Sequence, residues 1–101
     1  MVYDGKATVA TAGTRVPLLP ASTDHKIRLA FGLSVQNQKS GNTGACYVGG
    51  NTVSSSSGIE MVTPGDTYTF PTQNANVYDL STIFVDAATN GNVVKFVYSV
   101  R

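Results

Sequence analysis

The chain has 101 residues and a net charge of +1, and Asp, Glu, Lys and Arg together make up 13% of it. This length suits one domain with a single modest core, and the charged fraction is about half that of an average soluble domain. The seven Lys and Arg residues are scattered along the chain, so no basic patch is expected and nucleic acid is not expected as a partner.

No stretch approaches the roughly 18 uninterrupted apolar residues that a membrane helix needs, so no membrane partner is expected. Residues 1–6 lack the basic start and apolar stretch of a secretory signal, which predicts synthesis in the cytoplasm without a signal peptide. Cys46 has no second cysteine to pair with, and we expect it to be a small buried hydrophobe beside Tyr47.

The N-terminal residues differ from the rest of the chain. Residues 1–14 are rich in small side chains and carry little apolar bulk, and a terminus of this kind frays or becomes ordered against a neighbour. We therefore expect an extended N-terminal arm at 1–14 and a single β-sandwich domain at 15–101. Val2, Tyr3 and Val9 of the arm are candidate interface residues, together with Tyr78 of the domain.

Short strand-like runs, separated by turn residues, fill the chain. There are eight of them, at 6–10, 15–19, 27–36, 45–48, 59–62, 67–70, 82–85 and 93–100. Their number and spacing predict an all-β fold, a single compact antiparallel β-sandwich that is jelly-roll-like or a small barrel.

Alternation of apolar residues predicts which faces of these strands are buried. Residues 27–36 are expected to form one long central strand, buried on the face made by Ile27, Leu29, Phe31, Leu33 and Val35. In the last run we expect the buried face to carry Val94, Phe96 and Tyr98.

Turn residues predict the connections. Pro64-Gly65 fits the centre of a type II turn, and Asn90-Gly91 predicts that 82–85 and 93–100 form a hairpin. The only helical candidate is a single turn in the region 74–80.

Two segments, 44–51 and 81–88, each place an aromatic residue and then a valine before a loop of small residues. We expect them to be strands in similar positions of two sheets. Tyr47 and Phe84 are therefore expected to have structural roles.

Residues for catalysis or metal binding are few. His25 lies in a predicted turn, and one His with one Cys gives no spacing for a zinc site. Asp66 and Asp79 have turn contexts in which a carboxylate accepts hydrogen bonds from nearby amides, and Glu60 is expected on a solvent face. The loop 86–92 offers oxygen ligands for calcium but lacks a second acid. We therefore expect no enzyme and no cofactor.

The middle of the chain resembles small β-sandwich virion structural proteins of tailed bacteriophages. The resemblance rests on an Asn-Thr-Gly before an aromatic-Val-Gly strand, a Val-Ser-rich turn, a Pro-Gly-acid turn and a Leu-Ser-x-Ile-aromatic-Val-Asp strand. Here these are Asn42-Thr43-Gly44, Tyr47-Val48-Gly49, Val53-Ser54, Pro64-Gly65-Asp66 and residues 80–86. Together they span roughly half of the chain, and Met61 stands where a Leu-like residue is expected.

This resemblance implies a structural role on the virion, as a capsid decoration (cement) protein that binds the major capsid protein as a homotrimer on the capsid surface. No heptads or collagen-like repeats are present to build a fibre shaft. The alternative is a tail or head-fibre adhesion domain that binds carbohydrate, for which Tyr3, Tyr68 and Tyr78 are the candidate exposed aromatics.

Overall fold

The computed structural model of the chain describes residues 1–71 and 77–100. The described residues form ten strands and one short helix, in this order: β1 (Val2–Val9), β2 (Val16–Pro17), α1 (His25–Arg28), β3 (Leu29–Ala30), β4 (Gly32–Asn37), β5 (Cys46–Gly49), β6 (Ile59–Met61), β7 (Thr67–Thr69), β8 (Tyr78–Asp79), β9 (Phe84–Ala87) and β10 (Asn92–Ser99). The predicted all-β class is confirmed. In this part of the chain no helix is long and apolar enough to cross a membrane.

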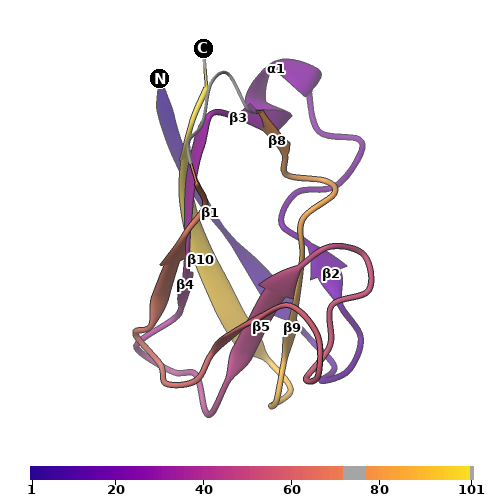
Figure 1. The fold of residues 1–101 in the computed structure, drawn as a ribbon, viewed down its shortest axis with the longest axis vertical. Helices are drawn as coiled ribbons and strands as arrows, with labels where there is room; N and C mark the ends of the chain where they lie inside the picture. Colours follow the sequence, from indigo (N-terminus) through magenta and orange to yellow (C-terminus); the bar gives the residue numbers. More distant parts are fainter. Residues whose placement is uncertain (72–76, 101) are drawn as a thin grey trace.

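Eight of the strands make two four-stranded sheets, in the orders β1-β10-β4-β7 and β2-β9-β5-β6. Strands β3 and β8 pair separately near α1 (Figure 1). Every pairing is antiparallel. The predicted antiparallel sandwich is confirmed, and its strand order is that of an eight-stranded jelly roll.

The strand pairing explains this order, because the described strands together form one long hairpin that is rolled up. Its first five strands pair in succession with its last five, β1 with β10, β2 with β9, β3 with β8, β4 with β7 and β5 with β6. The bend of the hairpin lies between β5 and β6. Rolling then adds the contacts of β10 with β4 and of β9 with β5, which complete the two sheets.

The core lies between the sheets and is filled by alternate residues of each strand. Strand β10 shows this best, because Val94, Phe96 and Tyr98 are buried while Lys95 and Val97 are exposed. The face predicted for this strand is confirmed. Alternation dictates which side is buried, because successive side chains of a strand point to opposite faces.

The long strand predicted at 27–36 is wrong in its first half. Residues 25–28 form α1 instead, which begins where the carboxylate of Asp24 accepts a hydrogen bond of 2.9 Å from the amide of Lys26. This N-cap satisfies a free amide of the helix locally. The extended segment after the helix is interrupted at Phe31, which lies between β3 and β4. The alternation holds within β4, where Leu33 and Val35 are buried.

The hairpin predicted between 82–85 and 93–100 is also wrong, because β9 and β10 belong to different sheets. The Asn90-Gly91 turn therefore carries the chain across the sandwich. The turn predicted at Pro64-Gly65 is confirmed: the amide of Asp66 donates to the carbonyl of Thr63 at 2.9 Å, and Gly65 has a φ of +103°.

The two similar segments, 44–51 and 81–88, were expected in separate sheets. They contain β5 and β9, which are direct neighbours in one sheet, with Val48 opposite Val85. The expected structural role of Tyr47 and Phe84 agrees with their packing, since both contribute to a small second cluster with Ala45 and Val53.

The N-terminal residues expected to form a separate arm contain the longest edge strand of the sandwich. Strand β1 pairs with β10 over its full length, from Val2 opposite Ser99 to Val9 opposite Asn92. The small side chains are what allow this, because the ring of Phe96 lies over Gly5, where a Cβ would be 2.7 Å from Cζ. The boundary at 14/15 therefore does not separate an arm from the fold.

The helical turn considered at 74–80 falls partly on residues 72–76, which lie outside the described residues. Within the described part, Asp79 ends β8 and its carbonyl accepts a hydrogen bond of 2.9 Å from the amide of Thr82. This is a turn between β8 and β9.

Candidate functional site

The four candidate interface residues lie in different environments. Val2 is 66% exposed on β1, whereas Val9 at the other end of the strand is fully buried in the core. Tyr3 is half-buried, with its ring centroid 5.7 Å from that of Tyr98. Val9 is therefore a core residue and does not offer a surface to a partner, and Val2 is the most exposed of the four.

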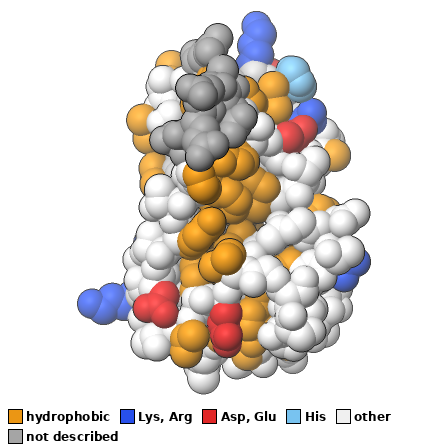
Figure 2. Space-filling view, in the orientation of Figure 1, with side chains coloured by type: hydrophobic (Ala, Val, Ile, Leu, Met, Phe, Trp, Pro, Cys, Tyr) orange, Lys and Arg blue, Asp and Glu red, His pale blue; other side chains and the backbone are white. Residues whose placement is uncertain are grey.

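Tyr78 of β8 is part of an aromatic cluster with residues of β7 and of the segment that follows β7. The ring of Phe70 is steeply inclined to those of both Tyr68 and Tyr78, at 74° and 68°, with centroid distances of 5.1 and 5.2 Å. Figure 2 shows hydrophobic side chains gathered in a strip down this face of the molecule. The hydroxyl of Tyr78 donates to the carbonyl of Pro71. Tyr78 thus makes contacts through its ring and through its hydroxyl, which favours a packing role.

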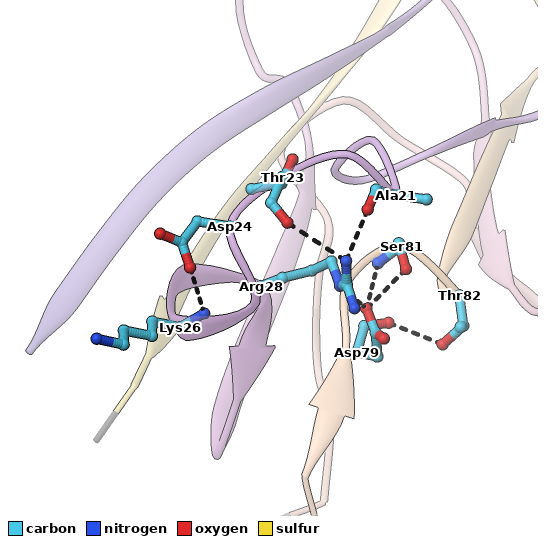
Figure 3. Close-up of polar contacts among 8 residues, drawn as sticks. All are labelled: Ala21, Thr23, Asp24, Lys26, Arg28, Asp79, Ser81 and Thr82. Carbon is cyan, nitrogen blue, oxygen red and sulfur yellow. Dashed lines mark hydrogen bonds and ion pairs between the residues drawn. The ribbon is translucent and has the colours of Figure 1, made fainter.

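Beside this cluster, Arg28 of α1 connects three segments of the chain (Figure 3). Its guanidinium donates to the carbonyls of Ala21 and Thr23 at 2.7 and 3.3 Å. Its Nε lies 2.9 Å from Oδ1 of Asp79, which also accepts hydrogen bonds from the amide and hydroxyl of Ser81. The pair holds α1 against the β8–β9 turn.

Several influences act on the carboxyl of Asp79. Burial raises its pKa, but the hydrogen bonds from Ser81 and the charge of Arg28 outweigh this and leave the pKa below its usual value. The carboxylate is therefore ionised over the neutral range and acts as an acceptor. The predicted turn role of Asp79 agrees with this geometry.

Three asparagines form a polar network at the opposite end of the sandwich, where loops of both sheets meet. The side-chain amide of the fully buried Asn37 donates to the carbonyls of Gly44 and Met61, both at 3.0 Å. The side chain of Asn42 donates to Oδ1 of Asn37 at 2.7 Å and also bonds both main-chain groups of Val93. These bonds join β4, β6 and β10 to the loop before β5.

The third asparagine, Asn92, extends this network to the loop before β5. Its side chain exchanges two hydrogen bonds with the main chain of Thr43, at 2.8 and 3.1 Å. The sequence did not single out Asn37 or Asn92. One sequence signal could have identified Asn37 as buried. It follows Leu33 and Val35 at a spacing of two, so alternation places it on the buried face of the strand.

Cys46 lies in the same network and is fully buried, as predicted. Burial raises the pKa of its thiol, a hydrogen bond from Asn92 lowers it, and the charge of Asp86 raises it further; the net effect is upward. The thiolate is the reactive form of cysteine, so this thiol is a poor nucleophile at neutral pH.

Asp86, the acid considered for calcium, is buried and serves the main chain. Its Oδ1 accepts hydrogen bonds from the amides of Gly13 and Ala87, at 2.9 and 2.8 Å. Glu60 is exposed on β6. Among residues 1–71 and 77–100, no group of three or more His, Cys, Asp or Glu side chains is placed to hold a metal ion.

The outer face of the β1-β10-β4-β7 sheet carries a shallow depression of about 500 Å³. Its outward-facing lining is polar apart from Val97, and consists of Asp4, Lys6, Ser34, Gln36, Thr67, Lys95 and Val97. Lys6 and Lys95 lie directly opposite each other on neighbouring strands. In the part of the chain that the structure describes, the only salt bridge is Arg28–Asp79, so neither lysine is paired with an acid.

Like charges directly opposite each other in a sheet are destabilising. Val97, next to Lys95 on the same face, is 45% exposed. A partner surface with acidic groups around an apolar centre would complement Val97 and the two lysines beside it. We refer to Lys6, Lys95 and Val97 as the sheet-face patch.

No family model, no curated protein and no solved structure matches this chain.

Proposed function

We propose that the protein is a capsid decoration protein of a tailed bacteriophage, which binds the outside of the head shell and stabilises it. The observation that carries the proposal is the rolled-hairpin jelly roll, an architecture that recurs in viral capsid and lectin domains. The motifs that resemble virion proteins contribute to this fold. Because a fold alone does not determine function, the proposal also depends on the surface of the protein.

The sheet-face patch is the proposed contact with the shell. Polar side chains surround Val97 there, and neither Lys6 nor Lys95 is paired with an acid among the described residues of the same chain. An acidic region of the major capsid protein would relieve the repulsion between the two lysines. Decoration needs only a modest interface for each copy, because many copies act together on one shell.

The test is co-sedimentation with particles of the phage that encodes the chain, grown without its gene. The wild-type protein is expected to bind, and cryo-electron microscopy is expected to place it on the head. The variant Lys95→Glu/Val97→Ser is expected to lose binding while staying folded, because both side chains point away from the core. Lys39→Glu, an exposed lysine in the loop after β4, is the control. Absence of wild-type binding to heads would refute the proposal.

The carbohydrate-binding alternative has less support from the geometry. A sugar ring stacks on the free face of an aromatic side chain, whereas Tyr78 contacts Phe70 and donates its hydroxyl to the carbonyl of Pro71. Tyr3 and Tyr68 are half-buried as well. A glycan array on which the protein binds a sugar and Tyr78→Ala does not would reverse this preference.

The homotrimer implied by the resemblance stays a prediction. The measurement of mass in solution described below distinguishes a trimer from a dimer and from a monomer.

A further inference from the structure

We propose that strand β1 is a pairing edge for a second copy of this chain, and that the two copies align antiparallel about a two-fold axis at Gly5. Among the described residues, β1 is the outer strand of its sheet and pairs with β10 alone. It runs for eight residues in unbroken register. The inference goes beyond the proposed function and does not depend on it.

Half of the residues of β1 have main-chain groups that do not bond to β10. Met1 and Val100 exchange two hydrogen bonds, of 3.0 and 2.8 Å. Because hydrogen-bonded pairs alternate in an antiparallel ladder, the odd-numbered residues of β1 bond to β10. The even-numbered residues Val2, Asp4, Lys6 and Thr8 therefore direct their N–H and C=O groups away from the sheet.

The edge also lacks most of the features that prevent pairing. Natural sheets protect long edges with proline, with bulges, with short strands or with charged side chains. Strand β1 contains no proline and no bulge, and it is eight residues long. Its only charged residues are Asp4 and Lys6, which have opposite signs and lie on the same face.

The charges select one register. Only three registers place even-numbered residues opposite each other near the middle of the strand. One brings Asp4 against Asp4 of the second copy, another brings Lys6 against Lys6, and both are repulsive. The third brings Asp4 against Lys6 of the second copy, and by symmetry Lys6 against Asp4.

The third register also fits the other side chains. Gly5 then faces Gly5 of the second copy across the axis, Tyr3 faces Ala7, and the exposed Val2 faces Thr8. No bulky pair is forced together. The two four-stranded sheets become continuous through β1, and each facing pair of even-numbered residues exchanges two main-chain hydrogen bonds.

The test is the mass of the full chain in solution, measured by sedimentation equilibrium. The wild type is expected at twice the chain mass. Asp4→Lys and Lys6→Asp are each expected to be monomeric, because each sets like charges opposite each other. The double variant Asp4→Lys/Lys6→Asp restores opposite charges and is expected to be dimeric again. Lys39→Asp carries the same charge change as Lys6→Asp away from the edge and is expected to stay dimeric.

Amide hydrogen exchange gives a second readout that a general loss of stability would not reproduce. In the dimer, the amides of Asp4 and Lys6 are expected to be protected. In the single variants, exchange at positions 4 and 6 is expected to become fast while Gly5 and Ala7, bonded to β10, stay protected. A monomeric or trimeric wild type, dimeric single variants or a monomeric double variant would overturn the inference. Failure to bind phage heads would leave it untouched, because the mass in solution and the amide exchange are measured without particles.

Discussion

Replacing Asn37 by alanine is expected to destabilise the protein severely without changing its surface. The side chain is fully buried and makes three well-formed hydrogen bonds, donating to the carbonyls of Gly44 and Met61 and accepting from Asn42. Each bond contributes about 1 kcal/mol, so we expect a loss of about 3 kcal/mol. This is a large part of the roughly 5–15 kcal/mol that stabilises a domain.

Urea unfolding followed by circular dichroism and tyrosine fluorescence measures this loss, since the chain has five Tyr and no Trp. With an m-value of about 1–2 kcal/mol/M, the midpoint should fall by roughly 1.5–3 M. The control is Gln38→Ala, which removes an exposed hydrogen bond to the carbonyl of Ser40 and should cost less than about 0.5 kcal/mol.

Asn37→Asp is a sharper test, because it keeps the shape of the side chain and places a carboxylate next to two carbonyl oxygens. Burial, together with two carbonyl oxygens that can only accept a hydrogen bond, raises the pKa of such a carboxyl group in the folded state. The folded protein then binds more protons than the unfolded chain, so this variant should lose stability as the pH rises. A loss below about 1 kcal/mol for Asn37→Ala, or wild-type stability for Asn37→Asp at neutral pH, would refute the role given to the network.

Three further outcomes are expected in the same unfolding assay. Gly5→Ala should cost about 1–3 kcal/mol by overpacking, because the new Cβ would lie 2.7 Å from the buried ring of Phe96; unchanged stability would show that the ring moves freely. Lys95→Glu should stabilise by about 0.5 kcal/mol, because it replaces the like-charged pair with Lys6 by an opposite one, and the gain should shrink in high salt. Because the pKa of Asp79 is lowered on folding, its carboxylate stabilises the protein above the unfolded pKa of about 3.9, and the advantage of wild type over Asp79→Asn should vanish as the pH falls through the folded-state value; an advantage independent of pH would contradict this.

The errors of the sequence prediction have local causes. The alternation of residues 27–36 is compatible with one strand, but Asp24 caps α1 and the chain changes partner at Phe31. The Asn90-Gly91 turn is real, yet a turn signal does not say whether the strands on either side of it share a sheet. The N-terminal residues have too little apolar bulk to predict a strand, and β1 is held instead by main-chain pairing with a segment about 90 residues away.

The candidate surface was less predictable than the fold. Alternation places Lys95 and Val97 on an outward face, but nothing local in the sequence says that Lys6 lies opposite Lys95. Of the residues expected at an interface, Val9 is in the core because β1 continues the sheet to its end.

The sequence by itself determined the all-β class, the buried face of β10 and the Pro64-Gly65 turn, since alternation and turn chemistry act between near neighbours. Only the tertiary structure decided which strands are partners, and with them the two-sheet order, the asparagine network, the sheet-face patch and the free edge of β1. These features depend on register between distant segments. Many registers satisfy the same alternation, and the one that forms is selected when both sheets close over a common core.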